Sequence, residues 1–524
     1  MSHKETFGRS RWLASKTTGE KGTNMATIDY ERLRIGRVVE ALAEGTEPHL
    51  LSGEQYKASL RDGRRIVDSA GNEIEDVTTH PDLAAVNTLG RVMDLQFDPE
   101  ARDAVTYVDD AGARRAVGWQ VPTKQEHLWA KRDAARRITL ETLGMYGRPP
   151  DYGPMMAMGF LSVIDRIEGE NAEFAQNLRD FVQLSGDHNL LSTDLIVDPQ
   201  SDRGIPRNEK PGQLRIVEDR PDGIVLRGAK VAGSIGSLAH FFTLSTVLGE
   251  GVTEDAAIWC AVPVNSPGLA LLLREPTVRS TGSREDHPLD SNGEEMDQII
   301  MFDDVFIPRE YLFSIRNTNL LDLYYESCAH ALWSIMMRLG FRAEIFAGTA
   351  QVITEILGTS KIPGVQNAVA EITLYAQTLK AYTTATIVDS VEWCGVQVPD
   401  PNLVTAGRLY SIQNYPRIQY LMQDLCGQAL ISRWPEKMWD HPEFGPKLEA
   451  YLPGTGVTAR EKNRFFNFVW DMTTGGQSGR VGLFENVNAT PPAYVSHLVY
   501  AHTDRSEMAN YVRNFVGIDS QSDL

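Results

Sequence analysis

The chain has 524 residues and a formal net charge of −19, with 51 Lys and Arg residues against 70 Asp and Glu. It contains no long basic run, so this balance argues against nucleic acid as a partner. With 42% hydrophobic residues the chain can bury a large core, and its length predicts two to four lobes.

Cysteine usage and hydropathy indicate a reducing, aqueous setting. The four cysteines stand too far apart for a zinc or iron–sulfur motif, so we expect free thiols and no metal site: Cys260, Cys328, Cys394 and Cys426. No apolar run is long enough for a membrane span, and the polar N-terminus lacks the apolar core of a signal peptide. These features predict a soluble, cytoplasmic protein without a membrane partner.

Residues 1–50 form an N-terminal extension to which we assign no chemistry. Residues 1–24 are rich in Lys, Arg, Thr, Ser and Gly, which predicts a flexible tail. Residues 30–43 place apolar positions at helical spacing among charged ones. We expect a helix there that packs on the body of the protein or on a neighbouring subunit.

The rest of the chain divides into three parts by periodicity. Residues 51–188 are mostly helical in pattern, for example at 125–143 and 174–184. Residues 189–310 change to short β-type runs at 223–228, 241–248, 256–262 and 298–302, which predict a small antiparallel sheet or barrel. Residues 311–524 return to long helical patterns, including 365–393 and 402–428, and predict a C-terminal bundle. The expected fold is mainly helical with a central β domain.

The segment 144–152 puts a guanidinium and a phenol four residues apart, at Arg148 and Tyr152. Pro149 and Pro150 forbid a regular helix here, so one helix should end before them and another should begin near Asp151. Arg148 keeps its charge at any working pH and offers several donors to a planar polar ligand. We therefore expect a ligand clamp, although a solvated Arg beside a half-buried Tyr is the structural alternative.

This segment belongs to an ordered set of short motifs. The others are GEQYKASLRDGR (53–64), DVTTHP (76–81), DPQSDR (198–203), DHPL (286–289), EMD (295–297), FDDVFIP (302–308), YPR (415–417) and WDMT (470–473). In this order and spacing, the chain resembles the 4-hydroxyphenylacetate 3-monooxygenase family from about residue 51 to about residue 511. The members are oxygenase components of two-component flavin-dependent aromatic hydroxylases, and they have an acyl-CoA dehydrogenase-like fold.

The resemblance implies an activity, a cofactor and partners. FAD would be used as FADH2, delivered by a separate NAD(P)H-flavin reductase, and would react with O2 to a C4a-hydroperoxide that hydroxylates an aromatic or N-heteroaromatic substrate. The protein would exclude water and hold the ring within reach. The resemblance also implies a homotetramer assembled through the C-terminal bundle, and it leaves open whether the substrate is free or carrier-tethered.

The resemblance also assigns site residues. Arg148 and Tyr152 match contacts to the substrate hydroxyl, and Ser234 matches a hydroxyl beside the flavin N5. Thr246 and Val247 fall near substrate contacts. The cofactor-binding positions are Leu195, Ile196, Val197, Gln200, Arg203 and Ser234, together with the glycine-rich loop formed by Gly476, Gln477, Ser478, Gly479 and Arg480.

Asp194 departs from the family pattern, which usually has a histidine at this position. An ionised carboxylate beside the ring disfavours a phenolate and favours an N–H donor or a cation. We therefore hypothesise a substrate with a ring nitrogen or an amine; equally, Asp194 could pair with Arg148 or cap a turn and act only in structure. His188 and His240 are candidates to replace the imidazole, with a core or surface role as the alternative.

Three other functions differ in the residues that they require. A 4-hydroxybutyryl-CoA dehydratase needs three cysteines and a histidine for its cluster, and the cysteine spacing speaks against it. An acyl-CoA dehydrogenase-type oxidoreductase needs a carboxylate base, for which Asp194 is a candidate. A non-catalytic interaction protein has no need of the Arg, Tyr and Gly motifs, so the sequence speaks against this alternative.

Overall fold

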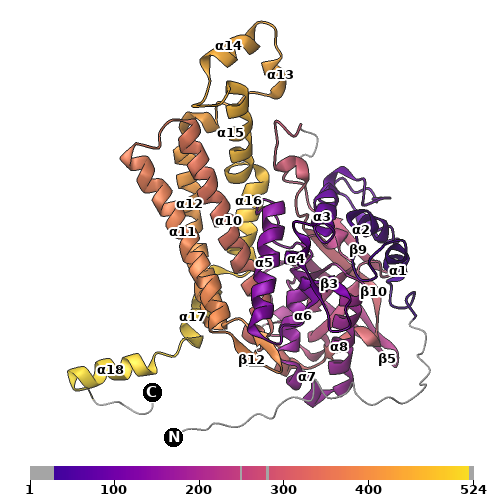
Figure 1. The fold of residues 1–524 in the computed structure, drawn as a ribbon. Helices are drawn as coiled ribbons and strands as arrows, with labels where there is room; N and C mark the ends of the chain where they lie inside the picture. Colours follow the sequence, from indigo (N-terminus) through magenta and orange to yellow (C-terminus); the bar gives the residue numbers. More distant parts are fainter. Residues whose placement is uncertain (1–28, 248, 250, 279–282, 519–524) are drawn as a thin grey trace.

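The computed structural model describes residues 29–247, 249, 251–278 and 283–518. The predicted tail at 1–24 lies outside these residues. Helical elements flank a central pair of β-sheets, and three long helices stand beside them as an upright bundle (Figure 1). The predicted order of helices, sheets and bundle is confirmed.

The N-terminal part is helical, as predicted. Its helices are α1 (Gly36–Ala43), α2 (Gly53–Ser59), α3 (Ala85–Asp94), α4 (Arg102–Val105), α5 (Gln125–Glu141), α6 (Gly153–Leu161), α7 (Ile164–Glu170) and α8 (Ala172–Asp187). A hairpin that the periodicity missed, β2 (Thr106–Val108) with β3 (Arg114–Ala116), interrupts them. The segment before α1 packs on the body of its own chain, because the Leu33 carbonyl accepts a hydrogen bond from Tyr311 at 2.7 Å.

Two sheets form the middle of the molecule. The first has the order β1-β9-β10-β6-β5, and the second has the order β11-β8-β7-β4. The strands are β1 (Ile66–Val67), β4 (Ser192–Leu195), β5 (Arg215–Arg220), β6 (Gly223–Ala232), β7 (Phe241–Ser245), β8 (Ile258–Pro263), β9 (Leu269–Leu273), β10 (Gln298–Pro308) and β11 (Leu312–Ile315).

The expectation of a purely antiparallel sheet was wrong at two edges. β1 pairs with β9 and β4 pairs with β7 in parallel. Parallel neighbours need a crossover connection, and here β5 and β6 of the other sheet lie between β4 and β7 in the sequence. Because β1 and β11 join from outside residues 189–310, the proposed domain boundaries remain predictions.

The C-terminal part is helical. Its elements are α9 (Tyr324–Ser327), α10 (Ala329–Ile356), α11 (Pro363–Val388), β12 (Val391–Trp393), β13 (Val396–Val398), α12 (Pro401–Cys426), α13 (Glu436–Trp439), α14 (Phe444–Tyr451), α15 (Ala459–Thr473), α16 (Gly476–Leu483), a π-helix (Phe484–Asn488), α17 (Pro492–His502) and α18 (Ser506–Val516). Prolines begin α11, α12 and α17, where their missing N–H costs nothing. No helix among the described residues is long and apolar enough to cross a membrane.

Aromatic contacts bind the N-terminal helices to the second sheet. Phe160 of α6 stacks on Trp259 of β8 with ring centroids 4.5 Å apart, and Phe181 of α8 meets Phe241 of β7 edge-on at 5.6 Å. Such pairs combine large apolar burial with a preferred geometry. They hold α6, and therefore the turn that precedes it, against the sheet whose edge strand β4 carries Asp194.

Candidate active site

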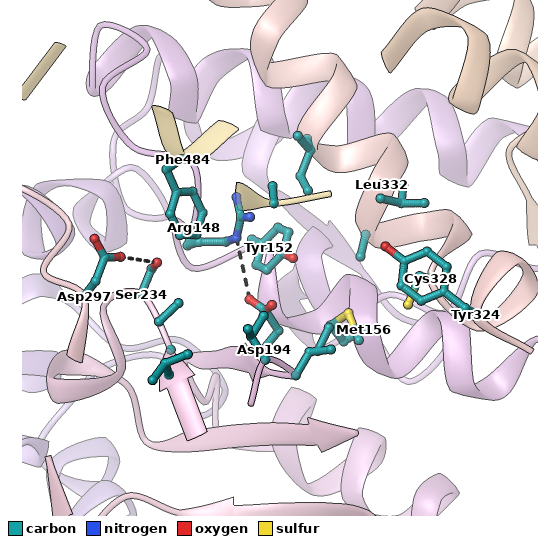
Figure 2. Close-up of a pocket in the computed structure, with 18 of the residues that line it drawn as sticks. Arg148, Tyr152, Met156, Asp194, Ser234, Asp297, Tyr324, Cys328, Leu332 and Phe484 are labelled. Carbon is teal, nitrogen blue, oxygen red and sulfur yellow. Dashed lines mark hydrogen bonds and ion pairs between the residues drawn. The ribbon is translucent and has the colours of Figure 1, made fainter. Parts of the chain in front are cut away.

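A cavity of about 480 Å³ lies where the N-terminal helices, the sheets and the bundle meet (Figure 2). Its volume falls within the range of small-molecule and cofactor sites. The lining residues are Arg148, Tyr152, Met156, Asp194, Ile196, Val197, Gln200, Val231, Ala232, Gly233, Ser234, Arg274, Asp297, Tyr324, Cys328, Ala331, Leu332, Ile335, Phe484 and Ala489. In Figure 2, Ser234 and Asp297 lie on one side of Arg148, and Tyr324 and Cys328 lie on the other.

Arg148 and Tyr152 lie together at the start of α6. Helix α5 ends at Glu141, the two prolines make a turn, and Tyr152 is the residue before the first turn of α6. The Arg148 guanidinium lies 4.3 Å from the Tyr152 ring centroid and 4.8 Å from that of Phe484. Arg148 is only 2% exposed, so its charge is held between two rings by cation–π attraction inside the protein.

Two carboxylates share the charge of Arg148. Its Nη1 donates to Glu485 at 3.1 and 3.4 Å, and its Nε lies 3.6 Å from Asp194 Oδ1. Burial works against the cation, yet Glu485, Tyr152 and Asp194 together raise the pKa of Arg148 above its usual value. Nε has no hydrogen-bond partner among the described residues. One guanidinium therefore lies between two acids, and its Nε faces Asp194 beyond hydrogen-bonding distance.

Asp194 stands on β4 at the cavity wall. Burial raises the pKa of its carboxyl, and the charge of Arg148 opposes that shift. Its side chain remains 22% exposed, so the ion pair with Arg148 leaves part of the carboxylate open to the cavity. The structure thus realises the predicted pairing without removing Asp194 from contact with a ligand.

Ser234 lies in a strained loop directly after β6. Ala232, Gly233 and Ile235 have φ values of 70°, 38° and 57°, in the left-handed region. A β-branched residue such as Ile235 rarely adopts this conformation, which persists only where surrounding contacts hold it. Here the Ile235 N–H donates to Met296 at 2.9 Å. The Ser234 hydroxyl donates to Asp297 at 2.6 Å and accepts from Arg480 at 3.1 Å.

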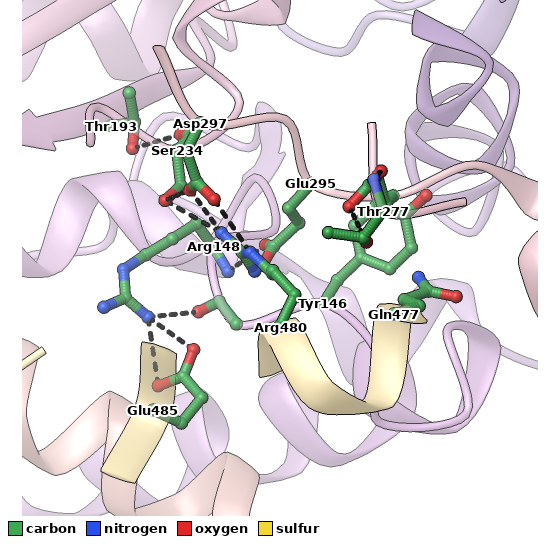
Figure 3. Close-up of polar contacts among 12 residues, drawn as sticks. Tyr146, Arg148, Thr193, Ser234, Thr277, Glu295, Asp297, Gln477, Arg480 and Glu485 are labelled. Atoms are coloured by element: carbon green, nitrogen blue, oxygen red, sulfur yellow. Dashed lines mark hydrogen bonds and ion pairs between the residues drawn. The ribbon is translucent and has the colours of Figure 1, made fainter. Parts of the chain in front are cut away.

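Arg480 connects this loop to the clamp (Figure 3). It donates to Asp297 Oδ2 at 2.9 Å and to Glu295 Oε2 at 2.8 Å. The other oxygen of Glu295 accepts the backbone N–H of Arg148. Arg480 is 8% exposed and Glu295 is 1% exposed, so a buried ionic network joins the two sides of the cavity.

The expectation of a loop at residues 476–480 was wrong, because these residues begin helix α16. Gly475 is the residue before the first turn of α16, so the N–H groups that follow it lie at a helix N-terminus. Gln477 donates to the Gly293 carbonyl at 3.1 Å, and Ser478 donates to the Met472 carbonyl at 2.7 Å. None of residues 476–480 lines the described cavity, and their cofactor role remains a prediction.

Other predicted residues also lie outside the lining of this cavity. Leu195 is fully buried in β4, and Arg203 is exposed in the turn that follows Gln200. Thr246 donates to the Ala256 carbonyl at 2.7 Å, next to Val247. Their assignments to cofactor and substrate remain predictions.

The sequence did not indicate Glu485 or Arg274. Glu485 is separated from Arg148 by more than three hundred residues and belongs to the π-helix, an irregularity that often marks functional sites. Arg274 lines the cavity and donates to Asp297 at 3.0 Å and to Glu294 at 2.8 Å. Neither residue stands in one of the recognised motifs, so no local signal could have found it.

Neither candidate histidine lines the cavity. His188 follows α8, and its ring contacts the Leu184 carbonyl at 2.9 Å. His240 is 5% exposed, and its Nδ1 accepts from the Leu191 N–H at 2.9 Å while its Nε2 contacts Ser59 at 2.8 Å. The core role, weighed as the alternative for His240, is the one observed.

Replacing His240 with Asn should reduce the loss of stability in acid. Burial, reinforced by the charge of Arg64, lowers the pKa of His240 to about 3 from 6.5. Between pH 6.5 and 3 His240 is protonated in the unfolded chain but neutral in the folded protein. The free energy of unfolding therefore falls by about 1.4 kcal/mol per pH unit as the pH drops below 6.5. Asn keeps an acceptor for the Leu191 N–H without this titration. Urea unfolding of both proteins from pH 7.5 to 5 would measure the slopes, and equal slopes would contradict the prediction.

Comparisons with known proteins agree with this architecture. The family model described as the N terminus of 4-hydroxyphenylacetate 3-hydroxylase matches residues 52–314, and its C-terminal counterpart matches residues 321–517. The 4-hydroxyphenylacetate 3-monooxygenase oxygenase component of Thermus thermophilus is 29% identical, with 89% of this chain and 97% of the relative covered. The FADH2-dependent monooxygenase TftD of Burkholderia cepacia is 31% identical, with 88% and 91% covered.

A solved structure of a 4-hydroxyphenylacetate 3-monooxygenase oxygenase component, complexed with FAD and 4-hydroxyphenylacetate, superposes with a TM-score of 0.83. It is 30% identical, and the match covers 89% of this chain and 98% of that one. The predicted acyl-CoA dehydrogenase-like fold class, with helical lobes around a central β domain, is confirmed.

Proposed function

This chain belongs to the 4-hydroxyphenylacetate 3-hydroxylase family, and on that premise we propose that it is the oxygenase component of a two-component aromatic monooxygenase. The family matches carry the proposal, because together they include every residue that lines the cavity. Relatives named as monooxygenases favour this activity over the dehydrogenase-type alternative with a carboxylate base.

The cavity has the size and chemistry to hold a flavin ring together with a small aromatic molecule. Its volume of about 480 Å³ exceeds what a lone small aromatic ring needs, and its walls combine apolar surface with a few charged groups. The Nε of Arg148 is buried and faces Asp194 at 3.6 Å without a hydrogen bond to a described residue, which leaves it able to donate to a ligand. We assign cofactor contacts to four lining residues, which are Ile196, Val197, Gln200 and Ser234.

Reduced FAD, when bound, supplies the two electrons with which O2 is split into one oxygen atom for the substrate and one for water. The residues of this chain provide the surroundings. Arg148 and Tyr152 position the substrate ring, and Asp194 accepts a hydrogen bond from it. Ser234, held by Asp297 and Arg480, presents a fixed hydroxyl dipole at the other end of the cavity. Met156, Leu332 and Ile335 exclude water from the space between.

The charges around Arg148 support a substrate with an N–H group. A phenolate beside Arg148 would also face the carboxylates of Glu485 and Asp194, which disfavour a further anion at this place. A pyrrole, indole, aminophenol or other amine would instead donate to the open edge of Asp194. We therefore propose an N–H-bearing aromatic substrate.

Exchange of Asp194 tests both the activity and the substrate class. The wild-type protein, supplied with FADH2 by a flavin reductase under ¹⁸O2, is expected to place one labelled oxygen in an N–H aromatic. Asp194→Asn should raise the dissociation constant of that substrate about tenfold or more, since a hydrogen bond to a charged group contributes about 1.5–3 kcal/mol. Asp194→His should gain phenol oxidation. Label incorporation is read by mass spectrometry, and substrate affinity is read by equilibrium dialysis.

The outcomes separate the two proposals. If no aromatic acquires ¹⁸O with the wild-type protein, the monooxygenase proposal fails. If phenols are labelled by the wild type and Asp194→Asn changes no affinity, the activity stands and the substrate proposal fails. Cys260→Ser provides a control, because this buried thiol lies in β8 outside the cavity lining.

We also propose a separate reductase, a cytoplasmic location where NAD(P)H is present, and a homotetramer. Helix α18 projects away from the body in Figure 1 and has no buried residue. Its apolar side chains Tyr511 and Phe515 are 73% and 84% exposed. A second copy of the chain would cover this surface, and analytical ultracentrifugation with and without residues 504–524 would determine the oligomeric state.

A further inference from the structure

A second polar cluster lies where the segment after residue 283 meets helix α15. His287, Asp290 and Asp471 each direct one ligand atom into it, and these atoms all lie within 4.8 Å of one another. None of the three residues lines the cavity described above. The sequence predicted no metal site, on the spacing of its cysteines; Asp471 lies 181 residues beyond Asp290, so no local pattern joins it to His287 and Asp290.

The two carboxylates are buried and incompletely paired. Asp471 is 0% exposed; its Oδ2 accepts the N–H groups of Leu289 and Asp290 at 3.0 and 3.3 Å. Its Oδ1 has no hydrogen-bond partner among the described residues, and the same is true of Asp290 Oδ1. Asp290 is only 9% exposed. Unpaired buried carboxylate oxygens are costly, so both point to a ligand in the space between them.

Neighbouring side chains do not supply the missing positive charge. Burial raises the pKa of Asp471, and the Arg433 guanidinium opposes this shift but makes its own contacts elsewhere. It donates to the Leu430 carbonyl and to Asn467, and it lies 4.1 Å from the Trp470 ring centroid. Glu294 adds a third acid nearby, and its oxygens are already bound by Arg274 and Thr277. His287 Nδ1 lies 3.9 Å from Asp471 Oδ1, too far for a hydrogen bond.

We propose that His287, Asp290 and Asp471 bind a divalent transition-metal ion of the Zn²⁺ or Mn²⁺ class. An imidazole with two carboxylates suits these ions, whereas Mg²⁺ and Ca²⁺ prefer oxygen ligands alone. Metal–ligand distances of about 2.0–2.2 Å place ligand atoms roughly 3–4.4 Å apart, so the cluster needs only a small contraction. The His287 side chain is 45% exposed and free to make it.

Such an ion would fasten the segment 287–290 to α15. That helix ends at Thr473 and leads directly into α16, which carries Arg480 to the Ser234 loop. The ion would therefore have a structural role outside the reaction site. This role predicts an effect on thermal stability that does not depend on flavin.

Metal binding to the full-length, chelator-treated protein tests the site by calorimetry with Zn²⁺, Mn²⁺ and Mg²⁺. We expect one Zn²⁺ or Mn²⁺ per chain, with affinity for Mg²⁺ at least about 100-fold weaker. His287→Ala and Asp290→Asn should each weaken transition-metal binding at least about 100-fold and abolish the rise in Tm that the metal produces. His497→Ala, which removes an exposed imidazole on α17, should behave as wild type.

The proposal is overturned if the wild type binds none of these ions, or if binding survives in both His287→Ala and Asp290→Asn, which would indicate an adventitious ion only. Two carboxylates that merely share a proton would show no metal-dependent rise in Tm. His287→Ala and Asp290→Asn leave in place the hydrogen bonds from the Leu289 and Asp290 N–H groups to Asp471 Oδ2.

Discussion

Replacing Arg148 with methionine is expected to abolish measurable hydroxylation and to destabilise the fold by roughly 3–5 kcal/mol. The substitution removes the guanidinium that forms ion pairs with both Glu485 and Asp194, and breaking a buried pair from one side strands the remaining charge. It also removes the cation between the Tyr152 and Phe484 rings. Urea unfolding measures the stability, and ¹⁸O incorporation measures the activity.

The double variant Arg148→Met with Glu485→Gln separates structure from function. Neutralising Glu485 should recover much of the lost stability, because the stranded charge disappears, while hydroxylation stays absent. Arg417→Met is the matched control: Arg417 pairs with Glu371 at 2.9 and 3.1 Å on the exposed surface, so its loss should change neither quantity appreciably. Recovery of activity in the double variant would show that Arg148 acts only as a structural cation.

Replacing Arg480 with methionine is expected to weaken FAD binding at least about 100-fold and to destabilise the fold by roughly 3–5 kcal/mol. Arg480 is the buried partner of Glu295 and Asp297, and it donates to the Ser234 hydroxyl. Its loss strands both acids and releases the strained loop whose geometry places Ser234 in the cavity wall. Fluorescence titration with FAD and urea unfolding measure the two effects.

Ser234→Ala separates the contribution of the Ser234 hydroxyl from that of the ion pairs of Arg480. It removes the hydroxyl while Arg480 keeps both carboxylates, so stability should change by only about 1 kcal/mol and flavin affinity should fall less than in the Arg480 variant. If Arg480→Met binds FAD as tightly as the wild type, the network is purely structural and the cofactor assignment of α16 is wrong.

Sequence reasoning succeeded where the cause was local. Pro149 and Pro150 end one helical pattern before the next begins, and the structure places α5 and α6 on either side of them. Apolar periodicity located α5, α8, α11 and α12 and the four strands β6, β7, β8 and β10, because that pattern reflects which face of an element is buried. The parallel edges of the sheets escaped notice, since strand pairing depends on chain crossovers that no local pattern records.

The sequence by itself determined the family, the order of a helical part, a β part and a second helical part, and the identity of Arg148, Tyr152, Asp194 and Ser234 as candidates. Only the tertiary structure decided which charged side chains contact these residues and hold them in place. Glu485 reaches Arg148, Arg480 reaches Ser234, and Asp471 reaches His287 across long stretches of chain. The physical reason is that burial and Coulomb interactions depend on distances in space, whereas sequence patterns register only neighbours along the chain.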